Sequence, residues 1–408
     1  MGILDGVSSR TDGETPTAAE LNELLEELVV LFNGGLPSSV LTWPMVAQGS
    51  IDMNTHSLVN VGSIGGVTTV NADRTLKQAV DLVNTAGGGI IAIDSDFVAE
   101  TETTPIVVTA DGVTIMGHGN SSVIHCVDLA ASGVSIQVTG DNFMMRDVKV
   151  TCASSVANLT HLVHIDGVSG YAVDNMVFDT PKKPALKLGG ATASYDGNIS
   201  RVRGNDAATS FIEVSHTRRS SISQCVFTEA GTAAITLPSG NLCLYTTISN
   251  NVVLNTGGGA AIDGGPTVGG GNFSELTVSN NILSCGTSDA LDAGYFTNFT
   301  VTGNVIYGDV TYNGQNSVFS GNTVYGDMVA TGTSRANIVG CYISGTFDVT
   351  DATCARSTFN SNSVNGHTTF PTTSGFDVVT GNRVNASLFI LTTDVAVFDN
   401  NYADGGTY

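Results

Sequence analysis

Basic residues are scarce in this sequence of 408 residues. Lys and Arg together number 15 against 37 Asp and Glu, and the formal net charge at pH 7 is −22. Binding through nucleic-acid phosphates needs clustered cations. The adjacent pairs Lys182-Lys183 and Arg218-Arg219 stand apart from other cations, and we interpret them as solvated loop charges. The sequence therefore predicts no nucleic-acid partner.

Long apolar segments are also missing. No stretch of eighteen apolar residues occurs, and the first twenty residues lack the basic start and apolar core of a secretory signal. We expect no transmembrane segment, no membrane insertion and no signal peptide.

The cysteines and the common catalytic and cofactor motifs give no indication of a metal or cofactor site. Seven Cys, an odd number without a CxxC pair, favour buried free thiols over disulfides or a thiolate metal site. No GxSxG, HExxH, phosphate-binding loop or calcium repeat is present. We expect neither a metal nor a cofactor.

What the chain has in abundance is small polar and β-branched residues, with 48 Gly and 13% charged residues. This mixture favours strands and turns, hence an all-β protein. Twelve aligned windows repeat at intervals of 18 to 30 residues; they begin at Met145, Val173, Ile199, Ile222, Ile248, Val278, Val301, Phe319, Ile338, Phe359, Val379 and Phe398. Such a period fits one coil of a solenoid. Twelve coils at the spacing of parallel strands would form a rod roughly 55 to 60 Å long.

Each window predicts how its side chains point. The first residue faces inward and ends a strand, the second and third turn the chain, and the fourth and sixth face inward on the next strand. The fourth positions are Val148, Met176, Val202, Cys225, Asn251, Asn281, Asn304, Asn322, Cys341, Asn362, Asn382 and Asn401. Inward Asn side chains can bond the coils above and below, so this column predicts an asparagine ladder interrupted at Cys341.

The segment before the repeats predicts a cap. Residues 71–94 predict a helix from Arg74 to Thr85, with Leu76, Ala79, Val80 and Val83 on one face, then Gly87-Gly88-Gly89 and a strand from Ile90 to Ile93. This pattern resembles the opening of pectate-lyase-like proteins, and the resemblance implies a right-handed parallel β-helix. We assign residues 65–110 to the capping helix and solenoid entry, and residues 111–408 to the β-helix.

Residues 1–64 differ from the rest. Residues 17–33 predict an amphipathic helix that packs either within its own domain or against copies of itself. The segment from Ser50 to Gly62, SIDMNTHSLVNVG, resembles a segment of phage tail fibre proteins near their virion-attached ends. The resemblance implies a virion-attachment and trimerisation region that docks on tail or adaptor proteins, in a homotrimer located in the virion tail.

Candidate functional residues cluster where the coils lengthen, since loops project there. Glycoside hydrolysis needs paired carboxyl groups, so Asp289 and Asp292 are the candidate catalytic residues. The candidate binding residues are Glu213, Asp263, Tyr295 and Phe296, with Glu275 a further acidic neighbour. His161 and His164 are interpreted as ordinary polar positions. A lyase would want an Asp cluster beside a basic residue, and the sequence departs from that pattern.

Three functions remain open. The leading one is a virion tail spike or fibre protein that recognises a host-surface glycan and mediates adsorption. The second is a tail spike depolymerase, a glycoside hydrolase acting on capsule or lipopolysaccharide. The third is a secreted cellular β-helix carbohydrate-active enzyme or adhesin.

Overall fold

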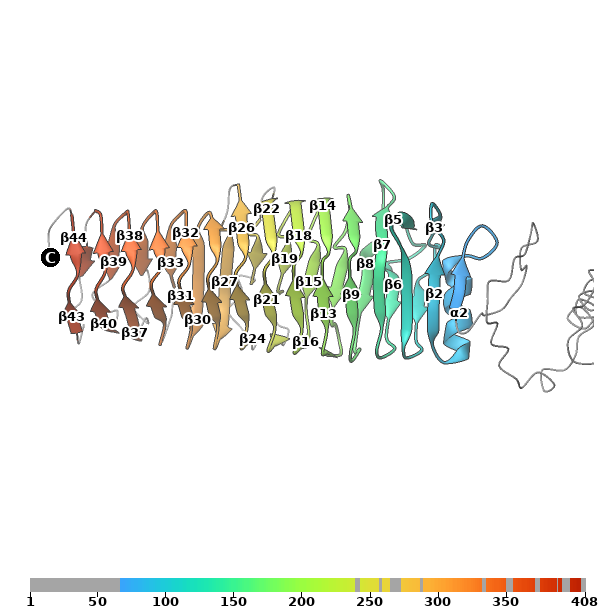
Figure 1. Cartoon of the computed structure of the whole chain (residues 1–408), viewed down its shortest axis with the longest axis horizontal. Helices are drawn as coiled ribbons and strands as arrows, with labels where there is room; N and C mark the ends of the chain where they lie inside the picture. The colour runs from blue at the N-terminus through green and yellow to red at the C-terminus, as the bar shows by residue number, and fades with distance from the viewer. Residues whose placement is uncertain are drawn as a thin grey trace, which may run out of the picture. The chain divides into compact units, whose positions relative to one another are not determined.

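The computed structural model describes residues 67–238, 243–256, 259–264, 273–286, 289–331, 335–349, 355–370, 375–386, 388–390 and 397–404. The chain divides into two compact units, Met1–Val61 and Gly62–Tyr408. The helix predicted over 17–33 and the segment 50–62 lie outside the described residues. In its described residues, the second unit is a stack of coils with one helix near the N-terminal end (Figure 1).

The cap is the helix α2 (Leu76–Ala86), and it forms where the sequence predicts it. Thr75 is the N-cap; its hydroxyl accepts from the Gln78 amide, while the Gln78 side chain accepts from the Thr75 amide. Gly87 ends the helix in the left-handed conformation. Leu76, Ala79, Val80 and Val83 are buried, as predicted, so the helix covers the apolar end of the solenoid.

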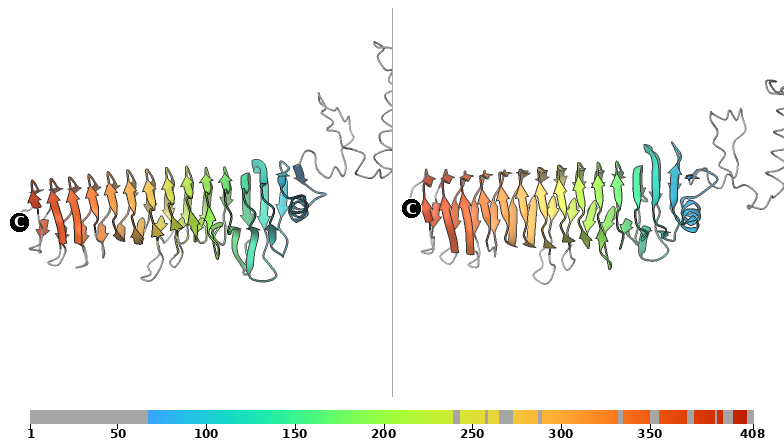
Figure 2. Two further views of the ribbon diagram at one scale, coloured as in Figure 1. Left: turned by 90° about the horizontal axis from the view of Figure 1, so that it is seen from below. Right: turned by 60° about the horizontal axis from the view of Figure 1, so that its bottom comes forward.

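The first sheet is a column of parallel strands that runs the length of the stack (Figure 2). Its strands are β1 (Val67–Val70), β2 (Gly89–Ile93), β5 (Val113–Cys126), β7 (Met144–Cys152), β9 (Ala172–Asp174), β13 (Asn198–Ser200), β17 (Ser221–Ser223), β21 (Thr247–Ser249), β25 (Thr277–Ser279), β28 (Thr300–Thr302), β31 (Val318–Ser320), β34 (Asn337–Val339), β37 (Ala355–Asn360), β40 (Gly375–Thr380) and β43 (Val397–Asp399).

The second sheet follows each bend. It contains β3 (Val98–Glu100), the ends of β5 and β7, β10 (Val177–Asp179), β14 (Arg203–Ala207), β18 (Val226–Ala230), β22 (Val252–Thr256), β26 (Ile282–Cys285), β29 (Val305–Tyr307), β32 (Thr323–Val324), β35 (Tyr342–Ile343), β38 (Ser363–Val364), β41 (Arg383–Val384) and β44 (Tyr402–Ala403).

The third sheet closes each coil. It contains β4 (Ile106–Val108), β6 (Gly133–Val138), β8 (Leu159–Ile165), β11 (Leu186–Leu188), β15 (Ile212–Val214), β19 (Ile235–Thr236), β23 (Ile262–Asp263), β27 (Leu291–Thr297), β30 (Val310–Gln315), β33 (Met328–Ala330), β36 (Phe347–Val349), β39 (Thr368–Phe370) and β42 (Leu388–Ile390). A short column beside it contains β12 (Ser194–Tyr195), β16 (Thr217–Arg218), β20 (Cys243–Leu244) and β24 (Phe273–Ser274).

The predicted repeat register is confirmed at every step. The first residues of the twelve windows pair in order across the first sheet, from Met145 with Val173 to Val379 with Phe398. The fold is therefore an all-β, right-handed parallel β-helix, as the sequence and its resemblance predict. It has about 13 turns, whereas the aligned windows predict twelve coils.

The asparagine column is also confirmed. Asn251 donates from its backbone and side-chain amides to Asn281 Oδ1 at 2.9 and 3.0 Å, and Asn281 does the same to Asn304. The pattern continues to Asn322 and resumes below Cys341 at Asn362, Asn382 and Asn401. The column satisfies buried polar groups within the core.

A left-handed residue stands at the third position of every window. The set is Asp147, Asn175, Arg201, Gln224, Asn250, Asn280, Gly303, Gly321, Gly340, Ser361, Gly381 and Asn400, with φ between 49° and 65°. This conformation makes the bend between the first and second sheets. It explains why Asn and Gly recur at the third position, since these residues tolerate it best.

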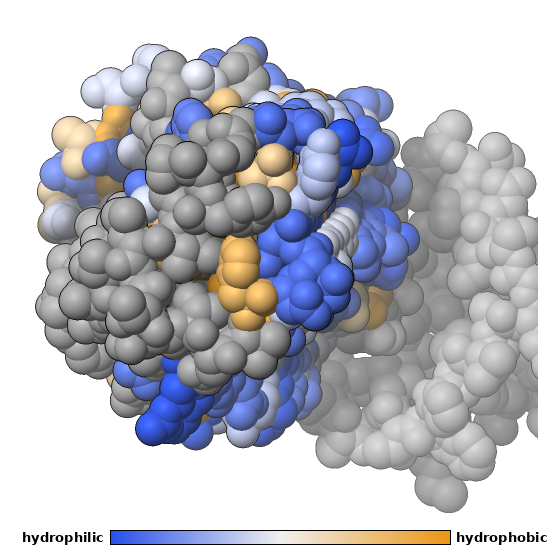
Figure 3. All heavy atoms as spheres, turned by 90° about the vertical axis from the view of Figure 1, so that its left-hand side faces the viewer, coloured by the Kyte–Doolittle hydropathy of each residue, from blue (hydrophilic) through white to orange (hydrophobic). Residues whose placement is uncertain are grey.

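The inward faces of the sheets form one continuous apolar core. The cysteines follow the prediction in part, because Cys126, Cys225, Cys243 and Cys341 are buried free thiols. Seen from its C-terminal end, the described surface is mostly hydrophilic, with small apolar patches (Figure 3). Among the described residues, no helix is both long and apolar enough to span a membrane.

Candidate functional site

Outward-facing polar residues align on consecutive strands of the third sheet. We call this alignment the polar column. Each member is in register with the next one along the stack, in the order His164, Lys187, Glu213, Thr236, Asp263, Asp292 and Thr311. The inward neighbours on the same strands, such as Ile212 and Leu291, are buried. The alternation of a strand therefore fixes the column on the outer face.

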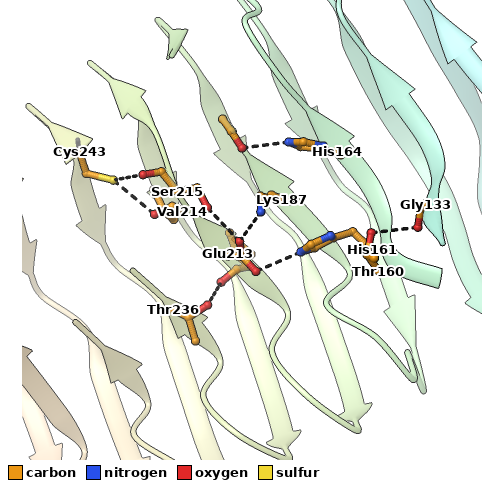
Figure 4. Close-up of polar contacts among 12 residues, drawn as sticks. Gly133, Thr160, His161, His164, Lys187, Glu213, Val214, Ser215, Thr236 and Cys243 are labelled. Carbon is orange, nitrogen blue, oxygen red and sulfur yellow. Dashed lines mark hydrogen bonds and ion pairs between the residues drawn. The ribbon is translucent and has the colours of Figure 1, made fainter. Parts of the chain in front are cut away.

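The first half of the polar column is an ion-pair network centred on Glu213 (Figure 4). His161 Nε2 lies 3.0 Å from Glu213 Oε2, and Lys187 Nζ lies 2.8 Å from Glu213 Oε1. The Ser215 hydroxyl donates to Glu213 Oε1 at 2.9 Å. The three donors come from different coils or strand positions, so stacking of the coils builds this network.

These contacts set the protonation of Glu213. Burial alone would raise its pKa, but hydrogen bonds from His161 and Lys187 outweigh burial and lower the pKa to about 2. His164 donates from Nε2 to the Gly189 carbonyl at 3.0 Å, and burial lowers its pKa despite that bond. Glu213 is a fixed anion at neutral pH, suited to orienting donors and unsuited to donating a proton.

The second half of the polar column is acidic. Asp263 and Asp292 pair in register on β23 and β27, and neighbouring parallel strands are about 4.8 Å apart. Asp289 lies three residues before Asp292, at the turn into β27. Burial, followed by the charges of Asp263 and Asp289, raises the pKa of Asp292 to about 6. Asp292 therefore holds a proton at mildly acidic pH.

A bulge follows Asp292. The register of β27 against β30 shifts between Ala293 and Tyr295. Bulges recur beside functional sites, where they change the direction of a side chain. Gly264 packs against this point: its amide donates to the Asp292 carbonyl at 2.7 Å, and a Cβ there would meet Phe296 at 2.6 Å. Close packing of the two coils therefore holds the Asp292 backbone in place.

The remaining predicted residues fall in different environments. Phe296 is buried and stacks on Phe299 with ring centroids 5.0 Å apart, so it belongs to the core and is not available to a ligand. The side chain of Tyr295 lies outside the described residues. Glu275 adopts a left-handed conformation ahead of β25, with φ of 61°. Of the predicted residues, the fold thus aligns Glu213, Asp263 and Asp292, with Asp289 beside them.

Three site residues escaped the sequence prediction. His161 and His164 were expected to be ordinary polar positions, and Lys187 was not singled out, yet His161 and Lys187 bind Glu213 directly. A signal was present, since Lys187, Glu213, Thr236 and Asp292 each follow the start of their window by fourteen residues. Asp263 follows its window start by fifteen residues, so the nearly constant offset marks one outward position on these coils.

The chemistry available to the polar column is that of carboxyl groups. One carboxyl that retains its proton beside a second carboxyl is the arrangement that glycoside hydrolysis uses. Within the described ranges, no group of three or more His, Cys, Asp or Glu is placed to hold a metal ion.

Comparisons with known proteins give likenesses of structure. No family model matches the chain, and no curated protein matches it either. A similar solved structure is the A-module of the mannuronan C-5 epimerase AlgE6 of Azotobacter vinelandii, with 13% identity, a TM-score of 0.48, and coverage of 81% of this chain and 95% of that one. Another is the catalytic unit of a GH87 α-1,3-glucanase of Streptomyces thermodiastaticus, with 13% identity, a TM-score of 0.45, and coverage of 80% and 66%. At these values, function must be argued from the residues of this chain.

Proposed function

We propose that this protein is a tail spike depolymerase, which binds a host-surface polysaccharide along the polar column and hydrolyses it. The observation that carries the proposal is the in-register pair Asp263 and Asp292, in which the pKa of Asp292 is raised to about 6. Asp292 is the general acid that protonates the leaving oxygen. Asp263 supplies the second carboxyl, as base or nucleophile.

The charge of the protein narrows the substrate class. The chain carries a formal charge of −22, and three of its carboxyl groups, those of Asp263, Asp289 and Asp292, lie at the proposed site. Like charges repel an anionic polymer from such a surface. We therefore propose a neutral or N-acetylated polysaccharide of capsule or lipopolysaccharide.

The position of this protein in a virion is part of the same proposal. It is supported by the resemblance of residues 50–62 to phage tail fibre proteins and by the β-helix. We assign residues 1–64 to attachment, on tail or adaptor proteins. Immunogold labelling of virions at the tail would support this position, and label elsewhere or on host cells alone would overturn it.

We also propose that the β-helix forms a homotrimer. Val226, Leu254 and Ile282 are large apolar side chains on the outer faces of the adjacent strands β18, β22 and β26, each 39% or 40% exposed. This patch carries no charge in a strongly acidic chain, so a second copy can cover it without repulsion. Light scattering of the Val226→Asp and Ile282→Asp double variant should show dissociation. A wild-type monomer would overturn the proposal.

The hydrolysis is tested by incubation with purified neutral capsule and O-antigen polysaccharides. New reducing ends and shortened chains are expected with the wild type, and Asp292→Asn and Asp263→Asn should each reduce the rate at least a hundredfold. Asp348→Asn is the matched control, because Asp348 occupies the same column three coils beyond Asp292. Equal rates in the wild type and the three variants would show that Asp263 and Asp292 are not catalytic residues.

Adhesion without cleavage is the second candidate function. The polar column continues over seven strands, from His164 to Thr311, which is longer than two reacting carboxyl groups require. The two functions separate cleanly, because an adhesin binds polysaccharide and leaves its chain length unchanged. That result with the wild type would favour adhesion.

A further inference from the structure

Three tyrosines and two asparagines line the outer face of the second sheet on five consecutive coils. Tyr307 ends β29, Tyr325 follows β32, Tyr342 begins β35, and Asn365 and Asn385 follow β38 and β41. We call this set the tyrosine–amide strip. It lies on a different sheet from the polar column, and neither the proposed chemistry nor the asparagine ladder uses it.

The tyrosines present their rings to solvent as a connected surface. Tyr307 and Tyr325 stack with ring centroids 4.9 Å apart and an interplanar angle of 9°. Tyr342 meets Tyr325 edge-on at 6.2 Å. Tyr307 and Tyr325 are each 47% exposed. The stacking fixes both rings, so little side-chain entropy is lost when a ligand covers them.

The asparagines continue the strip as a hydrogen-bonded chain. Arg383 Nε donates to Asn385 Oδ1 at 3.1 Å, Asn385 Nδ2 donates to Asn365 Oδ1 at 2.6 Å, and Asn365 Nδ2 donates to the Tyr342 hydroxyl at 2.7 Å. Asn365 and Asn385 are nevertheless exposed. Each amide has further donor and acceptor capacity, and the chain holds it in one orientation.

We infer that the tyrosine–amide strip binds a neutral sugar segment, and that it is a second polysaccharide-binding site. The stacked rings cover each other's faces and turn apolar edges and hydroxyl groups outward. These edges can contact the C–H groups of a sugar, and the oriented amides match its hydroxyl groups. The five side chains of the strip carry no charge, and beyond its last member, Arg383 and Asp404 supply one charge of each sign. A neutral ligand therefore suits the strip best. The inference rests on the proposed function, because it assigns the strip the same polymer.

A subunit interface is the rival occupant of this face. The aliphatic patch at Val226, Leu254 and Ile282 suits such an interface, whereas the strip differs from it in chemistry. A dry protein interface over Asn365 and Asn385 would leave amide groups without partners, at a cost of about 1 to 3 kcal/mol for each buried group. A hydroxyl-rich sugar supplies those partners.

The experiment measures binding of size-fractionated neutral O-antigen and capsule polysaccharides, free of uronic acid and phosphate, by affinity electrophoresis. We expect the double variant Tyr307→Ala and Tyr325→Ala to bind at least tenfold more weakly, and Asn365→Ala to bind about threefold more weakly. The double variant Tyr307→Phe and Tyr325→Phe keeps both rings and should bind within threefold of the wild type.

Tyr245→Ala is the matched control, since Tyr245 is a 57% exposed tyrosine outside the strip. Its binding should equal that of the wild type. Circular dichroism establishes that each variant is folded. Unchanged binding by the alanine double variant, or no binding by the wild type to any polysaccharide of the panel, would overturn the inference. Loss of subunit association in that variant, with binding retained, would assign the strip to an interface.

The inference and the proposed hydrolysis fail in different ways. Asp292→Asn should lose cleavage and keep binding at the strip. The alanine double variant should keep its rate on short oligosaccharides and lose its advantage on long chains, because the strip retains a polymer away from the polar column. If the wild type binds polysaccharide without cleaving it, the proposed hydrolysis is overturned and the binding role of the strip is not. Normal binding and cleavage by the alanine double variant would overturn only the binding role of the strip.

Discussion

The side-chain amide of Asn322 lies 3.8 Å from the sulfur of Cys341, whereas the amide of Asn304, one coil earlier, donates to Asn322 Oδ1 at 3.0 Å. The asparagine ladder thus has one weak step. The other contacts at position 341 match those of a ladder Asn. The Cys341 backbone amide donates to Asn362 Oδ1 at 2.9 Å, and the Cys341 sulfur lies 3.7 Å from the Phe319 carbonyl oxygen. In neighbouring coils an Asn amide donates to the equivalent carbonyl.

Replacement of Cys341 by Asn should therefore stabilise the β-helix. The new side chain would accept from Asn322 and donate to Phe319, and we expect the free energy of unfolding to rise by about 1 kcal/mol. Urea denaturation measures it. Cys341→Ala, which adds no hydrogen bond and leaves a small cavity, should lower the same quantity. A loss of stability in Cys341→Asn would show that the coil spacing there cannot accept the ladder.

Removal of a ladder residue should be costly. Asn281→Ala leaves the buried backbone amide of Asn251 without its partner and removes the side-chain donor to the Ile248 carbonyl. We expect a loss of about 3 kcal/mol, measured by urea denaturation. Asn205→Ala is the control: Asn205 is exposed and accepts one bond from Thr228, so its loss should stay below about 0.5 kcal/mol. Equal losses in both variants would contradict a structural role for the ladder.

The raised pKa of Asp292 predicts a pH dependence of stability. Burial and two neighbouring carboxylates raise the pKa to about 6 from its ordinary 3.8, so the folded state binds this proton more tightly than the unfolded state. The resulting stabilisation is present below about pH 4 and is lost as the pH rises to about 6. Asp292→Asn cannot ionise and should gain about 1 kcal/mol over the wild type at pH 7, with no gain at pH 4. Thermal melts at both pH values measure it, and a gain that is equal at both would contradict the assignment.

Glu213 predicts the opposite dependence. Its pKa is lowered to about 2 in the folded state, so its stabilisation is present above its ordinary pKa of 4.5 and is lost as the pH falls toward 2. Glu213→Gln keeps the shape but removes the charge that Lys187 and His161 contact. We expect a loss of about 2 kcal/mol at pH 7 that shrinks below pH 4. The same melts at pH 7 and pH 3 test this, and a loss that persists unchanged at pH 3 would exclude the ion pairs as its cause.

The sequence predicts the core residues better than the residues of the site, and the reason is physical. Inward positions are constrained locally, because alternation on a strand and the bend after each window repeat in every coil. The registers, the cap at Leu76–Ala86 and the asparagine ladder could therefore be read from spacing. Phe296 was expected at a surface because it neighbours Asp292 in sequence, but it stands at an inward position of β27 and packs on Phe299.

The sequence by itself determined the coil repeat, the buried faces and the place of the break at Cys341, since each depends on patterns within a few residues. Only the tertiary structure decided which outward side chains meet. Lys187 and Glu213 are separated by a whole coil in the chain. Their equal offset from the window starts marks one outward position, but only strand pairing brings the two side chains into contact. The same is true of Asp263 with Asp292 and of Tyr307 with Tyr325, because stacking about 4.8 Å apart brings together residues that the chain keeps far apart.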